Sequence, residues 1–133
     1  MIIDTHAHML PQSTLEAFSM ESDNFPSINL IKSEDKYQLS FNEKNPTRPI
    51  MPKLRIFSER EQFLSSNGID LQISGGWLDS FGYEIEPEEG ADWSRFLNEG
   101  MLADCKDRDG LVPLATVPMQ SGKLAAKVLQ EAI

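Results

Sequence analysis

Two histidines separated by a single residue are the side chains of this sequence best suited to chemistry. His6 and His8 are the only histidines among its 133 residues. In a β-strand, residues i and i+2 project from the same face, so both imidazoles would lie together with Asp4 one step behind them. Two neutral imidazoles suit a divalent ion, zinc above all, and a nearby carboxylate can orient a ligand histidine. The spacing predicts metal ligation by His6 and His8 with support from Asp4; the alternative is a chance pair on a half-exposed strand.

A strand at the N-terminus must carry these histidines, and the rest of the pattern alternates strands with helices. The expected strands cover 1–6, 69–74 and 111–117, and the expected helices cover 13–20, 58–67, 93–105 and 123–133. Capping boxes at Ser13 and Ser58 mark two helix starts, Gly68 is placed to end the second of these helices, and Asp92 caps the next. The last strand is apolar enough to be buried on both faces. This order of elements predicts parallel βαβ units in an α/β fold.

Two segments interrupt the alternation. Apolar and polar residues alternate over 28–41 around a charged centre, which predicts an inserted β-hairpin with its turn near Glu34 and Asp35. The three prolines of 45–52 predict a loop, and the acidic, aromatic stretch 77–90 predicts a longer one.

Length and charge narrow the choice of fold and partner. A chain of 133 residues makes one domain and is too short for a complete (β/α)8 barrel, which takes about 250 residues. The net charge of −9 argues against a nucleic-acid partner. There is no apolar run of about 20 residues and no signal-peptide pattern, so no membrane partner is expected. The single cysteine, Cys105, lies on an apolar helix stripe, which predicts a buried structural thiol and agrees with a cytoplasmic location.

Several motifs resemble one known family. The segment Ile3-Asp4-Thr5-His6-Ala7-His8-Met9-Leu10-Pro11 is similar to the opening of the amidohydrolase-related metal-dependent family, and closest to its aminocarboxymuconate-semialdehyde decarboxylase-like branch. Arg60 followed by Asn67-Gly68-Ile69-Asp70, and then the run from Gly110 to Gln120, resemble later segments of that branch in the same order. The resemblance extends over essentially the whole chain.

The resemblance implies a fold and a metal site. Members of the family are distorted (β/α)8 barrels in which the first His-x-His pair holds a divalent metal. Further ligands and an acid/base histidine come from later strands. Those later histidines are not in this chain, because His6 and His8 are its only histidines. The resemblance covers about three βα units plus the hairpin near 28–41, so it implies an N-terminal fragment of one barrel domain. The chain also stops at Ile133 in mid-helix, so we expect a homo-oligomer or pairing with a missing downstream half.

The same resemblance implies an activity. The full-length protein is expected to be a metal-dependent decarboxylase, a carbon–carbon lyase that acts on a small unsaturated or aromatic carboxylic acid with Zn²⁺ or another divalent ion. No catalytic residue is assigned within this chain. Two other interpretations stay open: hydrolysis of an amide or lactone with the same metal, and an inactive fragment that survives as an interaction or structural piece.

Two residues are candidates for substrate contact. Related decarboxylases grip a substrate carboxylate with an arginine from the region of Arg48, a task that suits a planar guanidinium, and Arg55 is its competitor. Trp77 follows the second strand on the face where barrel active sites are built. The alternatives are a solvated surface arginine and an aromatic side chain that packs on the barrel rim.

Overall fold

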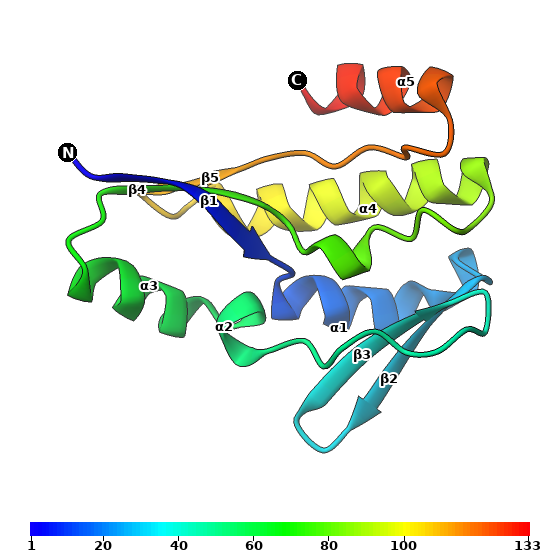
Figure 1. Ribbon diagram of the computed structural model, residues 1–133, viewed down its shortest axis with the longest axis horizontal. Coiled ribbons are helices and arrows are strands. Elements are labelled where there is room, and N and C mark those ends of the chain that lie inside the picture. Colours follow the sequence, from blue (N-terminus) through cyan, green and yellow to red (C-terminus); the bar gives the residue numbers. More distant parts are fainter.

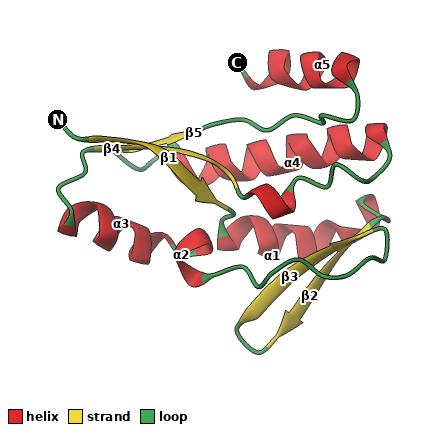
Figure 2. Ribbon diagram, viewed as in Figure 1, coloured by secondary structure: helices red, strands yellow, loops and turns green.

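The computed structural model describes all of residues 1–133 and contains a three-stranded parallel sheet beside a separate two-stranded hairpin (Figure 1). The strands are β1 (Ile3–Met9), β2 (Ile28–Ser33), β3 (Lys36–Phe41), β4 (Leu71–Gly76) and β5 (Leu111–Pro113). The helices are α1 (Gln12–Glu21), α2 (Pro52–Arg55), α3 (Phe57–Ser66), α4 (Pro87–Cys105) and α5 (Gly122–Ala132), with 3-10 turns over Ser22–Asn24 and Leu78–Ser80. The α/β class and the parallel βαβ arrangement are confirmed (Figure 2).

The parallel sheet has the order β1-β4-β5, so β4 is central and both outer strands have an open edge. β1 pairs with β4 from Ile3 opposite Leu71 to Met9 opposite Gly76. The register shifts once between Asp4 and Ala7, where β1 advances three residues while β4 advances two. This bulge lies in the segment that carries the two histidines, and bulges commonly redirect side chains beside functional sites.

Helices α3 and α4 pack against one face of this sheet. A cluster of five buried side chains joins the two helices to the strands: Met9, Leu64, Met101, Cys105 and Leu111. Burial raises the pKa of the Cys105 thiol, as expected for a structural cysteine. On the opposite face Val112 is 39% exposed, because no layer of the chain covers it.

The larger core lies between α1, the hairpin and the N-terminal half of α4. Phe18 and Trp93, both almost fully buried, meet edge to face with ring centroids 5.0 Å apart. Helix α1 approaches α4 closely at Gly100, where a Cβ would come within 2.3 Å of the Thr14 hydroxyl oxygen. A glycine is therefore required at this helix crossing.

The hairpin predicted over 28–41 is present, with Ile28 opposite Phe41 and Ser33 opposite Lys36. Its turn contains Glu34, whose φ is +52°. That this hairpin is an insertion into a barrel stays a prediction.

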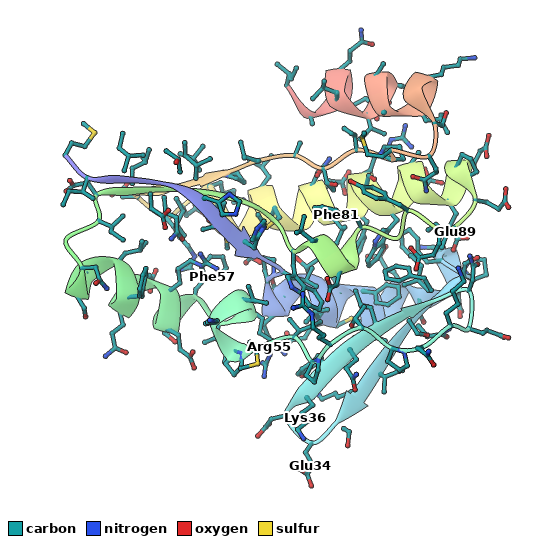
Figure 3. All side chains as sticks on the ribbon, in the orientation of Figure 1. Glu34, Lys36, Arg55, Phe57, Phe81 and Glu89 are labelled. Atoms are coloured by element: carbon teal, nitrogen blue, oxygen red, sulfur yellow. The ribbon has the colours of Figure 1, made fainter.

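Arg55 fastens the hairpin to α1. Its buried guanidinium donates to Gln12 Oε1 at 2.7 Å and to the Asp35 carbonyl at 2.8 Å, and it stacks over the Tyr37 ring. Figure 3 labels Arg55 between α2 and the hairpin. Arg55 is therefore a structural residue and not a competitor of Arg48 for substrate.

Both predicted capping boxes are wrong. Helix α1 begins directly after the extended residue Pro11, so Ser13 lies inside the helix and its hydroxyl donates to the Asp104 carboxylate. Helix α3 begins after Ile56, one residue before Ser58, with no side-chain cap. Gly68, with φ +63°, follows the C-cap of α3 as predicted.

The segments 77–90 and 111–117 also differ from expectation. Helix α4 begins at Pro87, because proline is well suited to the first helical turn, and Asp92 lies inside it and pairs with Arg95. Strand β5 ends at Pro113, and one further main-chain bond joins this segment to β4, from the Leu114 N–H to the Ser74 carbonyl at 2.8 Å. The exposure of Val112 shows that burial of this strand on both faces was also predicted wrongly.

The open edges and the uncovered sheet face lead to a first prediction. Ile3 is 46% exposed and Val112 39% exposed, beside strand edges with unpaired backbone groups. We expect residues 1–133 alone to self-associate, and we expect Val112→Lys to reduce this association, because a charge on the open face opposes burial. Light scattering and calorimetry measure both effects.

Leu102→Lys is the matched control, since Leu102 is 60% exposed but belongs to α4. A sharp thermal transition of a monomer for the unmodified chain would contradict this prediction.

Candidate metal centre

The two histidines lie together near the carboxyl end of β1. Their ring centroids are 5.0 Å apart and their planes meet at 85°. His6 is exposed and His8 is half-buried. The carboxyl ends of parallel strands are the usual place for sites in α/β folds, so the sheet presents this pair where ligands commonly bind.

The His8 ring is held by the neighbouring strand. Its Nδ1 lies 3.0 Å from the carbonyl oxygen of Gly76, the last residue of β4. A carbonyl can only accept a hydrogen bond, so Nδ1 carries a proton, and in the neutral ring the lone pair is then on Nε2. Histidines that ligate metals commonly donate their second ring nitrogen to a carbonyl in this way.

Asp4 supports the histidine segment through the backbone. Its Oδ1 accepts from the His6 backbone N–H at 3.1 Å, and its Oδ2 accepts from Gln72 Nε2 at 2.7 Å. The hydrogen bond from Gln72, followed by that from His6, lowers the pKa of Asp4 below its ordinary value. The carboxylate is therefore ionised at neutral pH, and its two bonds go to a main-chain N–H and a side-chain amide instead of an imidazole.

A buried arginine completes the surroundings of the pair. Arg60, on α3 and 8% exposed, donates to the His8 carbonyl at 2.6 Å, to the Lys53 carbonyl at 3.2 Å and to the Gln72 side-chain oxygen. Burial lowers its pKa from the ordinary arginine value. Sequence reasoning assigned no role to Arg60 or Gln72. The available signals were an arginine one helical turn before Leu64 and a glutamine between the apolar residues Leu71 and Ile73.

The donor set fits part of a zinc site. Two imidazoles fill half of a tetrahedral shell, and catalytic zinc usually has three protein ligands. Residues 1–133 contain no group of three or more His, Cys, Asp or Glu side chains arranged to hold a metal ion. His6 and His8 could therefore supply two ligands, and a complete shell needs others.

Arg48 and Trp77 lie in different environments. The Arg48 side chain is 76% exposed and donates twice to the Asp79 carboxylate, at 2.9 and 3.1 Å. These bonds raise the pKa of Arg48, and a substrate carboxylate would have to displace Asp79 to bind there. Trp77 is 6% exposed and belongs to the main apolar cluster, so in this structure it is a packing residue.

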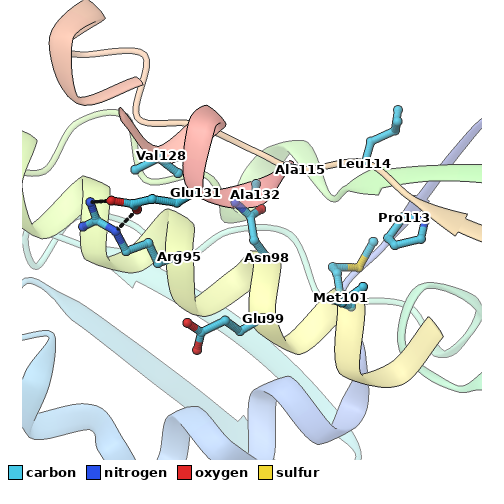
Figure 4. A pocket seen from close by; sticks show the side chains of 11 residues that line it. Arg95, Asn98, Glu99, Met101, Pro113, Leu114, Ala115, Val128, Glu131 and Ala132 are labelled. Carbon is cyan, nitrogen blue, oxygen red and sulfur yellow. Dashed lines mark hydrogen bonds and ion pairs between the residues drawn. The ribbon is translucent and has the colours of Figure 1, made fainter. Parts of the chain in front are cut away.

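A cavity of about 260 Å³ lies elsewhere, between α4, α5 and the segment after β5 (Figure 4). On its wall Arg95 donates to Glu131 at 2.6 Å, which joins α4 to α5. None of His6, His8 and Asp4 lines this cavity, so it is separate from the candidate metal centre.

Comparison with known proteins supports the predicted resemblance. No protein-family model matches the chain. The chain is 27% identical over 133 residues to the 2-amino-3-carboxymuconate-6-semialdehyde decarboxylase of Caenorhabditis elegans, covering 98% of this chain and 33% of that protein. The resemblance to the decarboxylase branch of the amidohydrolase-related family is thus confirmed, for an N-terminal portion.

Two solved structures share the fold. The apo form of IDCase from Metarhizium anisopliae matches with a TM-score of 0.68 and 14% identity. The 5-carboxyvanillate decarboxylase LigW from Sphingomonas paucimobilis matches with a TM-score of 0.65 and 18% identity. Each match covers 98% of this chain and 38% of the other. The chain therefore spans about a third of the length of these relatives. None of its helices has the length and apolarity needed to cross a bilayer.

The incomplete donor set gives a second prediction. Calorimetric titration of residues 1–133 with Zn²⁺ should show weak binding or none, because two imidazoles leave the shell half filled. Any binding should disappear in the His6→Ala/His8→Ala double variant. Nanomolar affinity in the unmodified chain would show that further side chains complete the shell.

Proposed function

We propose that this chain belongs to a metal-dependent, non-oxidative decarboxylase that removes carbon dioxide from an unsaturated or aromatic carboxylic acid. The observation that carries the proposal is the pair of imidazoles at the carboxyl end of β1, with the ring of His8 fixed by Gly76. The resemblance to decarboxylases over almost the whole chain supports the same reaction class.

In this proposal His6 and His8 hold one divalent ion, with zinc as the first candidate. The chemistry that such an ion supplies when bound is Lewis-acid stabilisation of negative charge on the substrate. The ionised Asp4 fixes the backbone of His6, and the Gly76 carbonyl fixes the tautomer of His8. The chain holds no third histidine, so we assign the acid/base group to a residue outside 1–133.

Arg48 is the candidate for binding the substrate carboxylate. Its guanidinium already forms a bidentate pair with Asp79, which shows that its position admits the fork geometry of such a contact. A substrate carboxylate would replace Asp79 as the partner. Trp77 directly precedes the turn that carries Asp79 and contributes only by packing in the main apolar cluster.

The test measures two reactions in parallel on the protein as its gene encodes it. The protein is loaded with Zn²⁺ and given aromatic and unsaturated carboxylic acids for carbon dioxide release, and amides and lactones for hydrolysis. We expect carbon dioxide release that falls to background in His6→Ala and in His8→Ala, because each variant removes a ligand. The isolated residues 1–133 should give no turnover.

Thr5→Ala is the matched control, since Thr5 is an exposed neighbour in the same strand and should be replaceable without loss of activity. Hydrolysis without carbon dioxide release would replace the proposal with a hydrolase. Absence of both reactions would favour the interpretation that the chain is an inactive fragment with an interaction or structural role.

A further inference from the structure

A continuous run of hydrogen bonds connects α3 to the backbone of both histidines. Arg60 donates to the His8 carbonyl with one guanidinium nitrogen and to Gln72 Oε1 with another. Gln72 Nε2 donates to Asp4 Oδ2, and Asp4 Oδ1 accepts from the His6 N–H. Arg60 and Asp4, joined through Gln72, therefore bond to the main chain of His8 and His6, the histidines in and just after the β1 bulge between Asp4 and Ala7.

The direction of this run is fixed by the chemistry of its two ends. A guanidinium can only donate hydrogen bonds, and an ionised carboxylate can only accept them. The amide of Gln72 must therefore turn its oxygen to Arg60 and its nitrogen to Asp4, as observed. Reversing the amide would place two donors opposite each other at one end and two acceptors at the other.

Because Gln72 and Arg60 are buried, their polar side chains cost more free energy than apolar side chains that only filled the same space. Gln72 is 2% exposed and Arg60 8% exposed, between the sheet and α3. Burying an arginine and an amide there costs desolvation that apolar side chains of similar size would avoid. What the polar groups add is a fixed geometry for a bulged strand, which has lost part of its own ladder.

We propose that Arg60, Gln72 and Asp4 are positioning residues that hold the bulged backbone of β1 so that both imidazoles project together. The inference deepens the proposed metal-dependent function and rests on it for its functional meaning. None of the three residues contacts the ion in this proposal, because they act through the main chain of His6 and His8.

A swap of the amide and the carboxylate tests the direction of the bonds. Asp4→Asn places two donors opposite each other, at Gln72 or at the His6 N–H, whichever way the new amide turns. Gln72→Glu places two carboxylates within hydrogen-bond distance. The double variant Asp4→Asn/Gln72→Glu restores every donor–acceptor pair, because the new carboxylate accepts from Arg60 and from the new amide.

The first readout needs no metal. Hydrogen exchange at pH 7, followed by mass spectrometry, compares a peptide covering 5–9 with one covering the hairpin 28–41. Each single variant should speed exchange of 5–9 about tenfold, the effect of one lost hydrogen bond, and the double variant should return it close to the original rate. Exchange of the hairpin should stay unchanged.

The second readout is Zn²⁺ affinity by calorimetry, measured, like the exchange, on the protein as its gene encodes it. Loss of a residue that supports a metal ligand lowers affinity about 10–100-fold, so the single variants should bind more weakly and the double variant should recover. If the protein as its gene encodes it binds no Zn²⁺ while the exchange results are as expected, the proposed function fails and the positioning inference stands.

Arg60→Lys and Arg55→Lys form a matched pair, because both arginines are 8% exposed and both donate to a side chain and to carbonyls. Only Arg60→Lys should speed exchange of 5–9. Equal effects of the two lysine variants on 5–9, or a double swap that fails to recover in exchange while its thermal transition is preserved, would overturn the inference.

Discussion

The pairing of β1 with β4 is the constraint on which the candidate site depends. It places the last residues of β1 beside Gly76, so that the carbonyl of β4 fixes the ring of His8. The bulge between Asp4 and Ala7 would weaken this pairing if the backbone were left alone. Arg60 compensates from α3 by binding the His8 carbonyl and, through Gln72, the Asp4 carboxylate. The candidate site thus depends on β1, β4 and α3 together.

The sequence allowed the fold class, the hairpin and the position of the histidine pair to be predicted, because each depends on local periodicity. The register of 28–41 follows from alternation along the chain, and the shared face of His6 and His8 follows from their spacing. Helix starts were harder to predict. Helix α1 starts directly after Pro11 and helix α4 starts at Pro87, because proline fixes φ. Both starts come earlier in the chain than the Ser13 and Asp92 caps that the pattern suggested.

Contacts between distant segments could not be predicted. Arg60 and Gln72 are 12 residues apart, and nothing local indicates that their side chains meet. The same holds for Arg48 and Asp79, which are 31 residues apart, and for Trp77, whose burial depends on the hairpin and α4. Only the tertiary arrangement shows that Arg60 bonds to the backbone of His8 and that Arg48 already binds the Asp79 carboxylate.

If His6 and His8 share one ion, both imidazoles must coordinate it, and pulsed electron paramagnetic resonance of bound Cu²⁺ counts the imidazoles on the ion. Cu²⁺ binds imidazole more tightly than other first-row divalent ions, so it suits a half-filled site. We expect couplings from two imidazoles in the original chain and from one in either His6→Ala or His8→Ala. A spectrum with a single imidazole or none in the original chain would contradict it.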